Sequence, residues 1–266
     1  MNNLPEQGNR MPVLFIGHGS PMNAIEENVF TKGWKRIAGS IPRPRAILFI
    51  SAHWLTRGTW VTAMKKPKTI HDFAGFPPEL FAVDYPANGD PDLAREISAS
   101  ITRAQVELDE GAWGLDHGSW SVARPMFPDA SVPAIQMSID YHKPALYHYE
   151  LAKELAGFRN KGVLIIGSGN IVHNLGYVDY GNPDGGFDWA VEMNEEFKKL
   201  IREGDHYALI DYERLGKNSR LAVPTPDHYF PLMYSLGLQG NNEKLEIFND
   251  KAVFGSVAMT SVKIGN

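Results

Sequence analysis

Residues 13–21, Val-Leu-Phe-Ile-Gly-His-Gly-Ser-Pro, decide the fold of this chain. The four consecutive apolar residues 13–16 predict a strand that is buried on both faces, because a half-exposed strand alternates apolar and polar side chains. Strands of this kind are typical of the parallel sheet of an α/β protein. The strand is followed by a glycine and then by His18, which places a histidine at its carboxyl end.

Further segments of the chain repeat this pattern. Apolar runs predict strands at residues 46–50, 132–137, 163–166, 244–248 and 254–262. Amphipathic stretches between them predict helices at residues 91–103, 145–156, 188–202 and 227–236. The alternation predicts an α/β fold with a mostly parallel central sheet flanked by helices. We expect residues 1–266 to form a single catalytic domain, with its motifs between roughly residues 13 and 236.

Composition excludes several classes of function. The net charge is −5 over 266 residues, and acidic and basic residues are interleaved, so no basic stripe suggests nucleic-acid binding. The first ten residues, MNNLPEQGNR, lack the apolar segment of a signal peptide, and no apolar run is long enough to cross a bilayer. We therefore expect a cytoplasmic protein with neither a nucleic acid nor a membrane as partner.

The positions of the histidines are the most informative feature. His18 and His53 each directly follow a predicted strand, and His173 follows another after a glycine-rich turn. Ligands bind at the carboxyl ends of the strands in open α/β sheets, so these three side chains should converge on one site. The chain has no cysteine, so a metal would be held by imidazole and carboxylate groups. The sequence therefore predicts a histidine-built metal centre at this edge of the sheet.

The remaining histidines lie in other contexts. His117 is expected in a loop between helices, and His228 is expected to begin the aromatic helix at 227–236. His142 and His148 flank a predicted helix start, and we interpret both as surface residues. His71 lies in a Pro-rich loop that can reach the cleft. A single histidine after a strand is more often an ordinary hydrogen-bonded loop residue than a ligand, but three such residues together are hard to explain by coincidence.

Three other short segments resemble known motifs but lack residues that those motifs require. The turn at residues 17–20 has no Walker lysine, the turn at 167–169 is not followed by the acidic residue of a dinucleotide site, and Ser20 is not in a nucleophile elbow. Aromatic residues near the histidine motifs predict a mostly apolar pocket for a flat aromatic substrate. They are Trp54, Phe73, Phe76, Trp113, Trp120, Tyr229 and Phe230.

Five motifs occur in an order that resembles a known family. They are GHGSP at 17–21, SAHW at 51–54, LDHGSW at 115–120, GSGNIVHNL at 167–175 and PTPDHYFPL at 224–232. The set is similar to the class III extradiol ring-cleaving dioxygenases, and closest to their DOPA 4,5-dioxygenase branch. The resemblance extends from Gly17 to about Tyr234, which is nearly the whole chain.

The resemblance implies one divalent non-haem metal, a catechol such as DOPA and O₂ as substrates, and a muconate semialdehyde as product. It implies His18, His53 and His228 as metal ligands, with His173 as a further ligand or an acid/base, and His117 as a donor that orients the substrate. The protocatechuate-cleaving relatives use a carboxylate as the last ligand, whereas this chain has His228 preceded by Asp227. An all-histidine site suits Zn²⁺ as well as Fe²⁺, and ring cleavage is expected to need Fe²⁺.

Two other functions remain open from the residues alone. A zinc hydrolase would need a carboxylate base, for which Glu26 and Asp116 are the nearest candidates in sequence. A non-enzymatic binding protein on the same fold is the other alternative, although the five histidines argue against it. The sequence carries no signal of the oligomeric state.

Overall fold

One large sheet organises the molecule. The computed structural model describes residues 10–266, so residues 1–9, part of the segment judged to lack a signal peptide, lie outside the described residues. Within residues 10–266, eight strands form this sheet in the order β5 (Val106–Asp109), β3 (Thr59–Thr62), β7 (Ala134–Asp140), β2 (Ala46–Thr56), β8 (Val163–Gly169), β1 (Val13–Gly17), β12 (Ser261–Ile264) and β9 (Leu245–Phe248). The central strands β7, β2, β8 and β1 are parallel, while β12 and β9 add antiparallel neighbours. The predicted α/β fold with a mostly parallel sheet is confirmed.

Apolar side chains cover both faces of this sheet. Val13 and Phe15 of β1 belong to the core on one face, whereas Leu14 and Ile16 belong to the core on the other. Successive side chains of a strand point to opposite faces. An uninterrupted apolar run is therefore what a strand with helices on both sides requires.

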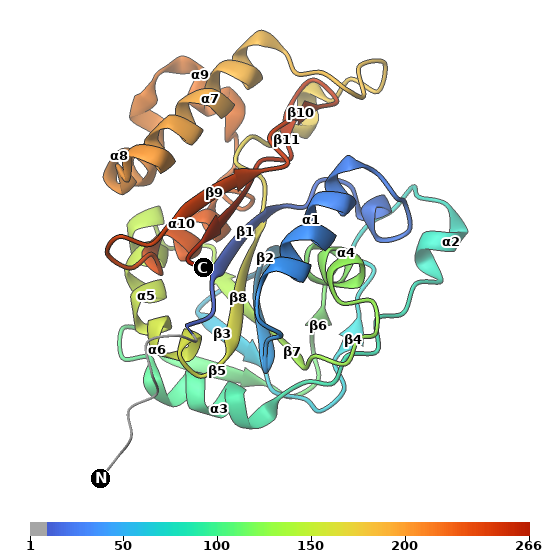
Figure 1. The fold of residues 1–266 in the computed structure, drawn as a ribbon, viewed down its shortest axis with the longest axis vertical. Helices are drawn as coiled ribbons and strands as arrows, with labels where there is room; N and C mark the ends of the chain where they lie inside the picture. Colours follow the sequence, from blue (N-terminus) through green and yellow to red (C-terminus); the bar gives the residue numbers. More distant parts are fainter. Residues whose placement is uncertain (1–9) are drawn as a thin grey trace.

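The helices are divided between the two faces (Figure 1). On one face lie α1 (Val29–Ser40) and α4 (His117–Met126), which pack against each other. On the other lie α3 (Pro91–Ser100), α5 (Ala145–Glu154) and α10 (Phe230–Gly237), and α7 (Asp188–Glu203) contributes buried side chains to the same core. No helix formed by the described residues is long and apolar enough to span a membrane.

Short elements connect these larger ones. They are η1 (Pro21–Ala24), β4 (Lys68–Thr69), α2 (Pro78–Phe81), β6 (Gly114–Leu115), α6 (Ala156–Arg159), η2 (Leu175–Tyr177), α8 (His206–Ile210), η3 (Tyr212–Leu215), α9 (Lys217–Ala222), β10 (Ala252–Val253) and β11 (Val257–Ala258). In Figure 1, α7, α8 and α9 lie together beyond the edge of the sheet that ends in β9.

The structure departs from the sequence expectations at several elements. Helix α1 and strands β3 and β5 were not predicted. Helix α1 contains two glycines, and its buried positions include a threonine, so its apolar signal is weak. His142 is exposed as expected, but the surface interpretation of His148 is wrong, because its side chain is fully buried in α5. Its Nδ1 lies 3.1 Å from Tyr234 Oη.

Candidate metal centre

His18 stands at the carboxyl end of β1, as predicted. The backbone N–H of His18 donates to the carbonyl of Gly169 at 3.0 Å, so pairing with β8 continues up to the histidine. Gly17, just before it, allows the chain to pass close to a neighbouring segment: a Cβ at this position would lie 2.6 Å from the backbone of Met259. The strand pairing and this close approach fix the position of the His18 backbone, and therefore the point from which its side chain extends.

His53 lies inside β2 and not after its end, which corrects the sequence expectation. Strand β2 continues to Thr56, and its register with β7 shifts between Ile50 and Leu55. Register irregularities of this kind redirect side chains at the edges of sites. The apolar run ends at Ile50, whereas the strand continues past His53. The run therefore predicts that His53 lies near the site, but it does not reveal the register shift on which the position of the imidazole depends.

His117 is the first residue of α4, and the loop expected there is wrong. Asp116 caps the helix, with its carboxylate accepting from the backbone N–H of Ser119 at 3.1 Å. The motif LDHGSW is therefore a capping sequence as well as a site sequence. The imidazole of His117 is held at the rigid start of a buried helix.

His173 and His228 are brought together from different parts of the chain. The backbone of His173 donates to the carbonyl of Ala222 at 2.8 Å, and the carbonyl of His228 accepts from Asn170 at 2.9 Å. Helix α10 begins at Phe230, so His228 precedes the helix rather than beginning it. The two imidazoles stack with ring centroids 3.6 Å apart and planes 9° apart.

The five histidines named from the sequence thus meet in one cluster. Potential ligand atoms of His18, His53 and His117 lie within 4.8 Å of one another, and so do those of His173, Asp227 and His228. The His228 ring centroid lies 5.2 Å from that of His18 and 4.9 Å from that of His53, which joins the two groups. The cluster lies at the carboxyl ends of the central parallel strands, where the sequence placed it.

In the three imidazoles that the resemblance implies as ligands, the Nδ1 atom faces an oxygen. His18 Nδ1 lies 3.0 Å from Ser168 Oγ, and that hydroxyl donates to a backbone carbonyl, so it accepts from His18. His53 Nδ1 lies 3.4 Å from Asp72 Oδ2, and His228 Nδ1 contacts Asp227 Oδ2. A hydrogen on Nδ1 leaves the lone pair of each ring on Nε2.

These Nε2 atoms form a donor set that fits a divalent ion. His18 Nε2 and His53 Nε2 are 3.2 Å apart. Two nitrogens bound to one Zn²⁺ at about 2.0–2.1 Å and the tetrahedral angle would be about 3.3 Å apart. Burial, with the neighbouring histidines adding to it, holds the pKa of His18 and of His53 well below the usual value. Both rings are therefore neutral at neutral pH, and a cation is the natural partner of their converging lone pairs.

The electrostatic surroundings of His173 differ from those of its stacked neighbour. Burial, and then the charge of His228, lower the pKa of His173 to about 2, while Asp227 acts in the opposite direction. Burial raises the pKa of the Asp227 carboxyl, but its contact with His228 outweighs this and holds the pKa well below the ordinary range. His173 is therefore a neutral imidazole, and Asp227 is an ionised carboxylate behind His228.

Asp72 is a site residue that the sequence analysis missed. Its Oδ1 accepts from the backbone N–H of His117 at 3.0 Å and also lies 3.0 Å from Nδ1 of the same residue, while its Oδ2 faces His53. The Nδ1 contact of His117 is a close charge contact and not an aligned hydrogen bond. Asp72 comes from the long loop that follows β4, next to His71, and no periodic pattern marks it.

The aromatic residues near the cluster are only partly where the sequence suggested. Phe73 packs edge-on against His117, with centroids 5.5 Å apart. Tyr229 and Phe230, by contrast, lie in the core on the face that α5 and α7 cover, packed against side chains remote from the cluster. His71 does not join the cluster, because its Nε2 lies 3.0 Å from the carbonyl of Val83.

Neither carboxylate proposed as a hydrolase base is placed to act as one. Asp116 is fully buried and is engaged by Ser119 and by Gln136. Burial, followed by the charge of Asp72, raises the pKa of Asp116 to about 6. Glu26 is exposed and lines a surface groove beside α1.

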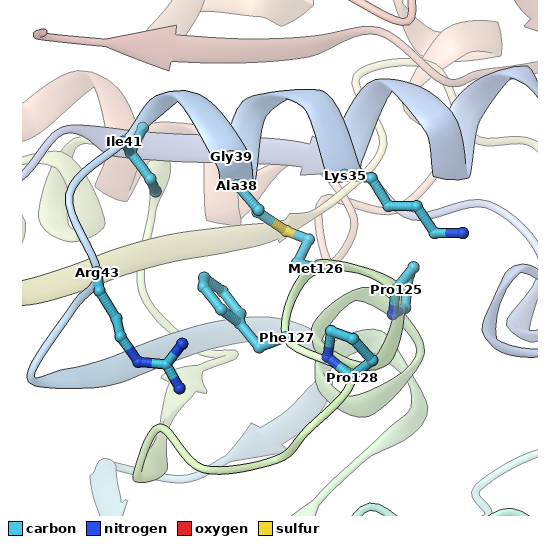
Figure 2. A pocket seen from close by; sticks show the side chains of 9 residues that line it. All are labelled: Lys35, Ala38, Gly39, Ile41, Arg43, Pro125, Met126, Phe127 and Pro128. Atoms are coloured by element: carbon cyan, nitrogen blue, oxygen red, sulfur yellow. The ribbon is translucent and has the colours of Figure 1, made fainter.

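A separate surface pocket of about 360 Å³ lies between the C-terminal parts of α1 and α4 (Figure 2). It is lined by Lys35, Ala38, Gly39, Ile41, Arg43, Pro125, Met126, Phe127 and Pro128, and by none of the histidines. Its two cationic side chains are already paired, Lys35 with Glu27 at 3.2 Å and Arg43 with Asp129 at 3.0 Å.

Comparison with known proteins agrees with this geometry. The family model described as the catalytic LigB subunit of aromatic ring-opening dioxygenase matches residues 12–264. The chain is 45% identical over 259 residues to a 4,5-DOPA dioxygenase extradiol of Escherichia coli (strain K12), covering 96% of this chain and 95% of that protein. It is 34% identical to one of Beta vulgaris, covering 97% of each. A crystal structure of an uncharacterized Escherichia coli K12 protein matches with a TM-score of 0.82 and 39% identity, over 96% of this chain and 100% of that one.

Proposed function

The chain belongs to the family of the catalytic LigB subunit of aromatic ring-opening dioxygenases and is an extradiol dioxygenase, and we propose that it opens the ring of a catechol such as DOPA at a metal held by His18, His53 and His228. The product is a muconate semialdehyde of the 4,5-seco-DOPA type. Residues 1–266 act as one catalytic domain. The cytoplasmic location expected from the sequence stays a prediction.

The observation that carries the ligand assignment is the convergence of Nε2 atoms. His18 Nε2 and His53 Nε2 face each other at 3.2 Å, and each ring has its Nδ1 against an oxygen. The same arrangement recurs at His228, whose Nδ1 contacts Asp227. Histidines that bind metals commonly donate their other N–H to a carboxylate or another oxygen, which fixes the tautomer. His173, stacked on His228, is placed either to add a fourth nitrogen or to act on the substrate.

The bound ion would favour the deprotonated form of a catechol and, as Fe²⁺, would supply the redox chemistry that O₂ requires. The protein side chains bind and orient the substrate. With Nδ1 directed to Asp72, His117 presents its Nε2 to the substrate and can accept a hydrogen bond from a catechol hydroxyl, whereas the sequence predicts a donor. His173 is neutral, so its ring nitrogen can accept a hydrogen bond from a catechol hydroxyl. To act as the acid/base, its pKa must lie closer to neutrality in the loaded site.

The entrance of the site suits a flat ring. The side chain of His53 is 18% exposed and that of Asp72 is 17% exposed, whereas His18 is only 1% exposed. A substrate therefore enters beside His53 and Asp72 and reaches His18 last. Phe73 lies against His117 at this entrance and offers an aromatic wall.

The test is oxygen consumption by Fe²⁺-loaded protein, prepared without air, with DOPA and a panel of other catechols. We expect uptake of one O₂ per catechol and a yellow product that absorbs in the visible. Zn²⁺-loaded protein should bind the same catechols without turnover, because Zn²⁺ has no redox chemistry. Hydrolysis of esters or amides without any O₂ uptake would favour the hydrolase, and no metal binding at all would favour a binding protein.

A further inference from the structure

Asp72 contacts two histidines to which the proposed function gives different tasks. Its Oδ2 is 3.4 Å from Nδ1 of His53, a proposed metal ligand. Its Oδ1 is 3.0 Å from Nδ1 of His117, the proposed substrate-orienting residue, and accepts from the backbone N–H of His117 as well. The His53 and His117 rings themselves are 3.8 Å apart between centroids.

We propose that Asp72 is a positioning residue that sets the tautomer and orientation of His53 and His117 together. The inference rests on the proposed function, because it takes His53 as a ligand and His117 as a substrate contact. One carboxylate then directs the Nε2 lone pair of His53 to the ion and that of His117 to the catechol. The two tasks are coupled, since movement of Asp72 displaces both rings.

The loop that carries Asp72 is anchored so that the carboxylate can act in this way. Ile70, two residues earlier, donates its backbone N–H to Leu115 at 2.8 Å, and the indole N–H of Trp120 donates to the carbonyl of Ile70 at 2.8 Å. Both partners flank His117 in sequence. The loop is therefore tied to α4 and to the strand before it, which holds Asp72 in place relative to His117.

The ionised state of Asp72 is also supported by its position. The carboxylate faces the N-terminus of α4, where a helix favours negative charge. An amide of the same shape lacks the charge and presents an N–H₂ group that cannot accept from an imidazole N–H.

The variant Asp72→Asn tests the inference, with Asp84→Asn as the matched control. Asp84 belongs to the same irregular region and is exposed, and its carboxylate accepts from Thr69 Oγ1 at 2.8 Å without contacting the cluster. Zinc affinity is measured by competition with a chelator. Loss of a carboxylate behind a ligating histidine typically costs about 10–100-fold in metal affinity. We expect this loss in Asp72→Asn and an unchanged affinity in Asp84→Asn.

Two further readouts separate positioning from general loosening of the loop. In the zinc form, proton NMR should show imidazole N–H signals of His53 and His117 that both shift in Asp72→Asn, because the charge facing each Nδ1 is lost. With Fe²⁺ at saturation, Asp72→Asn should raise KM for the catechol. In a His117→Ala background it should still weaken zinc binding but no longer raise KM.

The outcomes distinguish this inference from the proposed function. If wild-type protein binds no zinc and consumes no O₂ with catechols, the proposed function fails and the inference with it. If wild-type protein does both, but Asp72→Asn binds zinc within threefold of Asp84→Asn and leaves both N–H signals unshifted, the inference alone is overturned.

Discussion

Ser168→Ala is the sharpest test of how the site orients His18. The hydroxyl of Ser168 accepts from His18 Nδ1 at 3.0 Å and donates to the carbonyl of Gly118 at 2.5 Å. Ser168 is fully buried, and His18 is 1% exposed, so water does not replace the lost partner. The variant removes one oxygen and leaves the fold otherwise intact.

The expected cost follows from the group that is left without a partner. A buried donor that loses its hydrogen bond costs about 1–3 kcal/mol. The Gly118 carbonyl lies in the first turn of α4, where it can still accept a hydrogen bond within the helix. The group left without a hydrogen-bond partner is therefore Nδ1 of His18. We expect the metal-free protein to lose about 2 kcal/mol of its free energy of unfolding. Zinc affinity should also fall about 10–100-fold, because the tautomer of His18 is no longer held.

Ser121→Ala is the matched control. Ser121 is also a buried serine, 1% exposed, but among the described residues its hydroxyl has no hydrogen-bond partner. Removing that hydroxyl should change the free energy of unfolding by less than about 0.5 kcal/mol. Urea unfolding at equal m-values and chelator competition measure the two effects. The reasoning would be refuted if Ser168→Ala matched Ser121→Ala in both stability and zinc affinity.

Three further predictions concern other histidines. His18→Ala and His53→Ala should each lose the bound metal in elemental analysis, and full occupancy in either variant would contradict its assignment as a ligand. His117→Ala should keep the metal. Both His117→Ala and His173→Ala should lose about 10²–10⁴-fold in kcat/KM if these histidines act in substrate orientation or proton transfer. A loss below tenfold counts against a catalytic role, whereas recovery of His173→Ala by excess metal would make His173 a ligand. Burial lowers the pKa of His148 from 6.5 to about 4. The unfolded chain therefore binds the proton more tightly, and stability falls as the pH drops from about 6.5 towards 4, by up to about 3 kcal/mol. His148→Gln should abolish that part of the acid sensitivity, and parallel stability curves for the two proteins would show that His148 does not titrate in this way.

The positions of the cluster histidines could be predicted because strand ends leave a strong signal. An apolar run that stops at a glycine marks where β1 meets the cleft, so His18 needed no tertiary information. His173 was also placed correctly, because its turn follows the buried run of β8. For His53 the predicted place in the cluster agrees with the structure, but the predicted strand end does not. Strand β2 continues past His53, and its register with β7 shifts between Ile50 and Leu55.

The residues that contact the Nδ1 atoms of the cluster histidines have no comparable signal in the sequence. Asp72 lies on an irregular loop, whose path depends on anchors such as Ile70 to Leu115 rather than on any periodic pattern. Ser168 is one small residue in a buried strand, and only the parallel register that brings β8 beside β1 reveals its neighbour His18. Partners of this kind are set by tertiary packing.

His148 is a different case, because its signal was present in the sequence. Residues 148, 151 and 152 lie on one face of α5, at the spacing of neighbouring helical turns, and all three are buried. Polar neighbours at the predicted start of the helix suggested a surface position. The face shared with Leu151 and Ala152 is the better guide, because burial follows helical periodicity and not the polarity of one residue.

The pair Asp227 and His228 bears on which metal the centre uses. The carboxylate of Asp227, next to His228 in sequence, contacts Nδ1 of His228 and acts through the ring. A charge at about 6 Å interacts about three times more weakly with an ion than one at about 2 Å in the same medium. An ion held by three neutral imidazoles therefore keeps more of its positive charge for catechol oxygens. Such a nitrogen set accepts both zinc and iron. Because only iron supports the reaction with O₂, activity should depend on the fraction of sites that contain iron rather than on total metal.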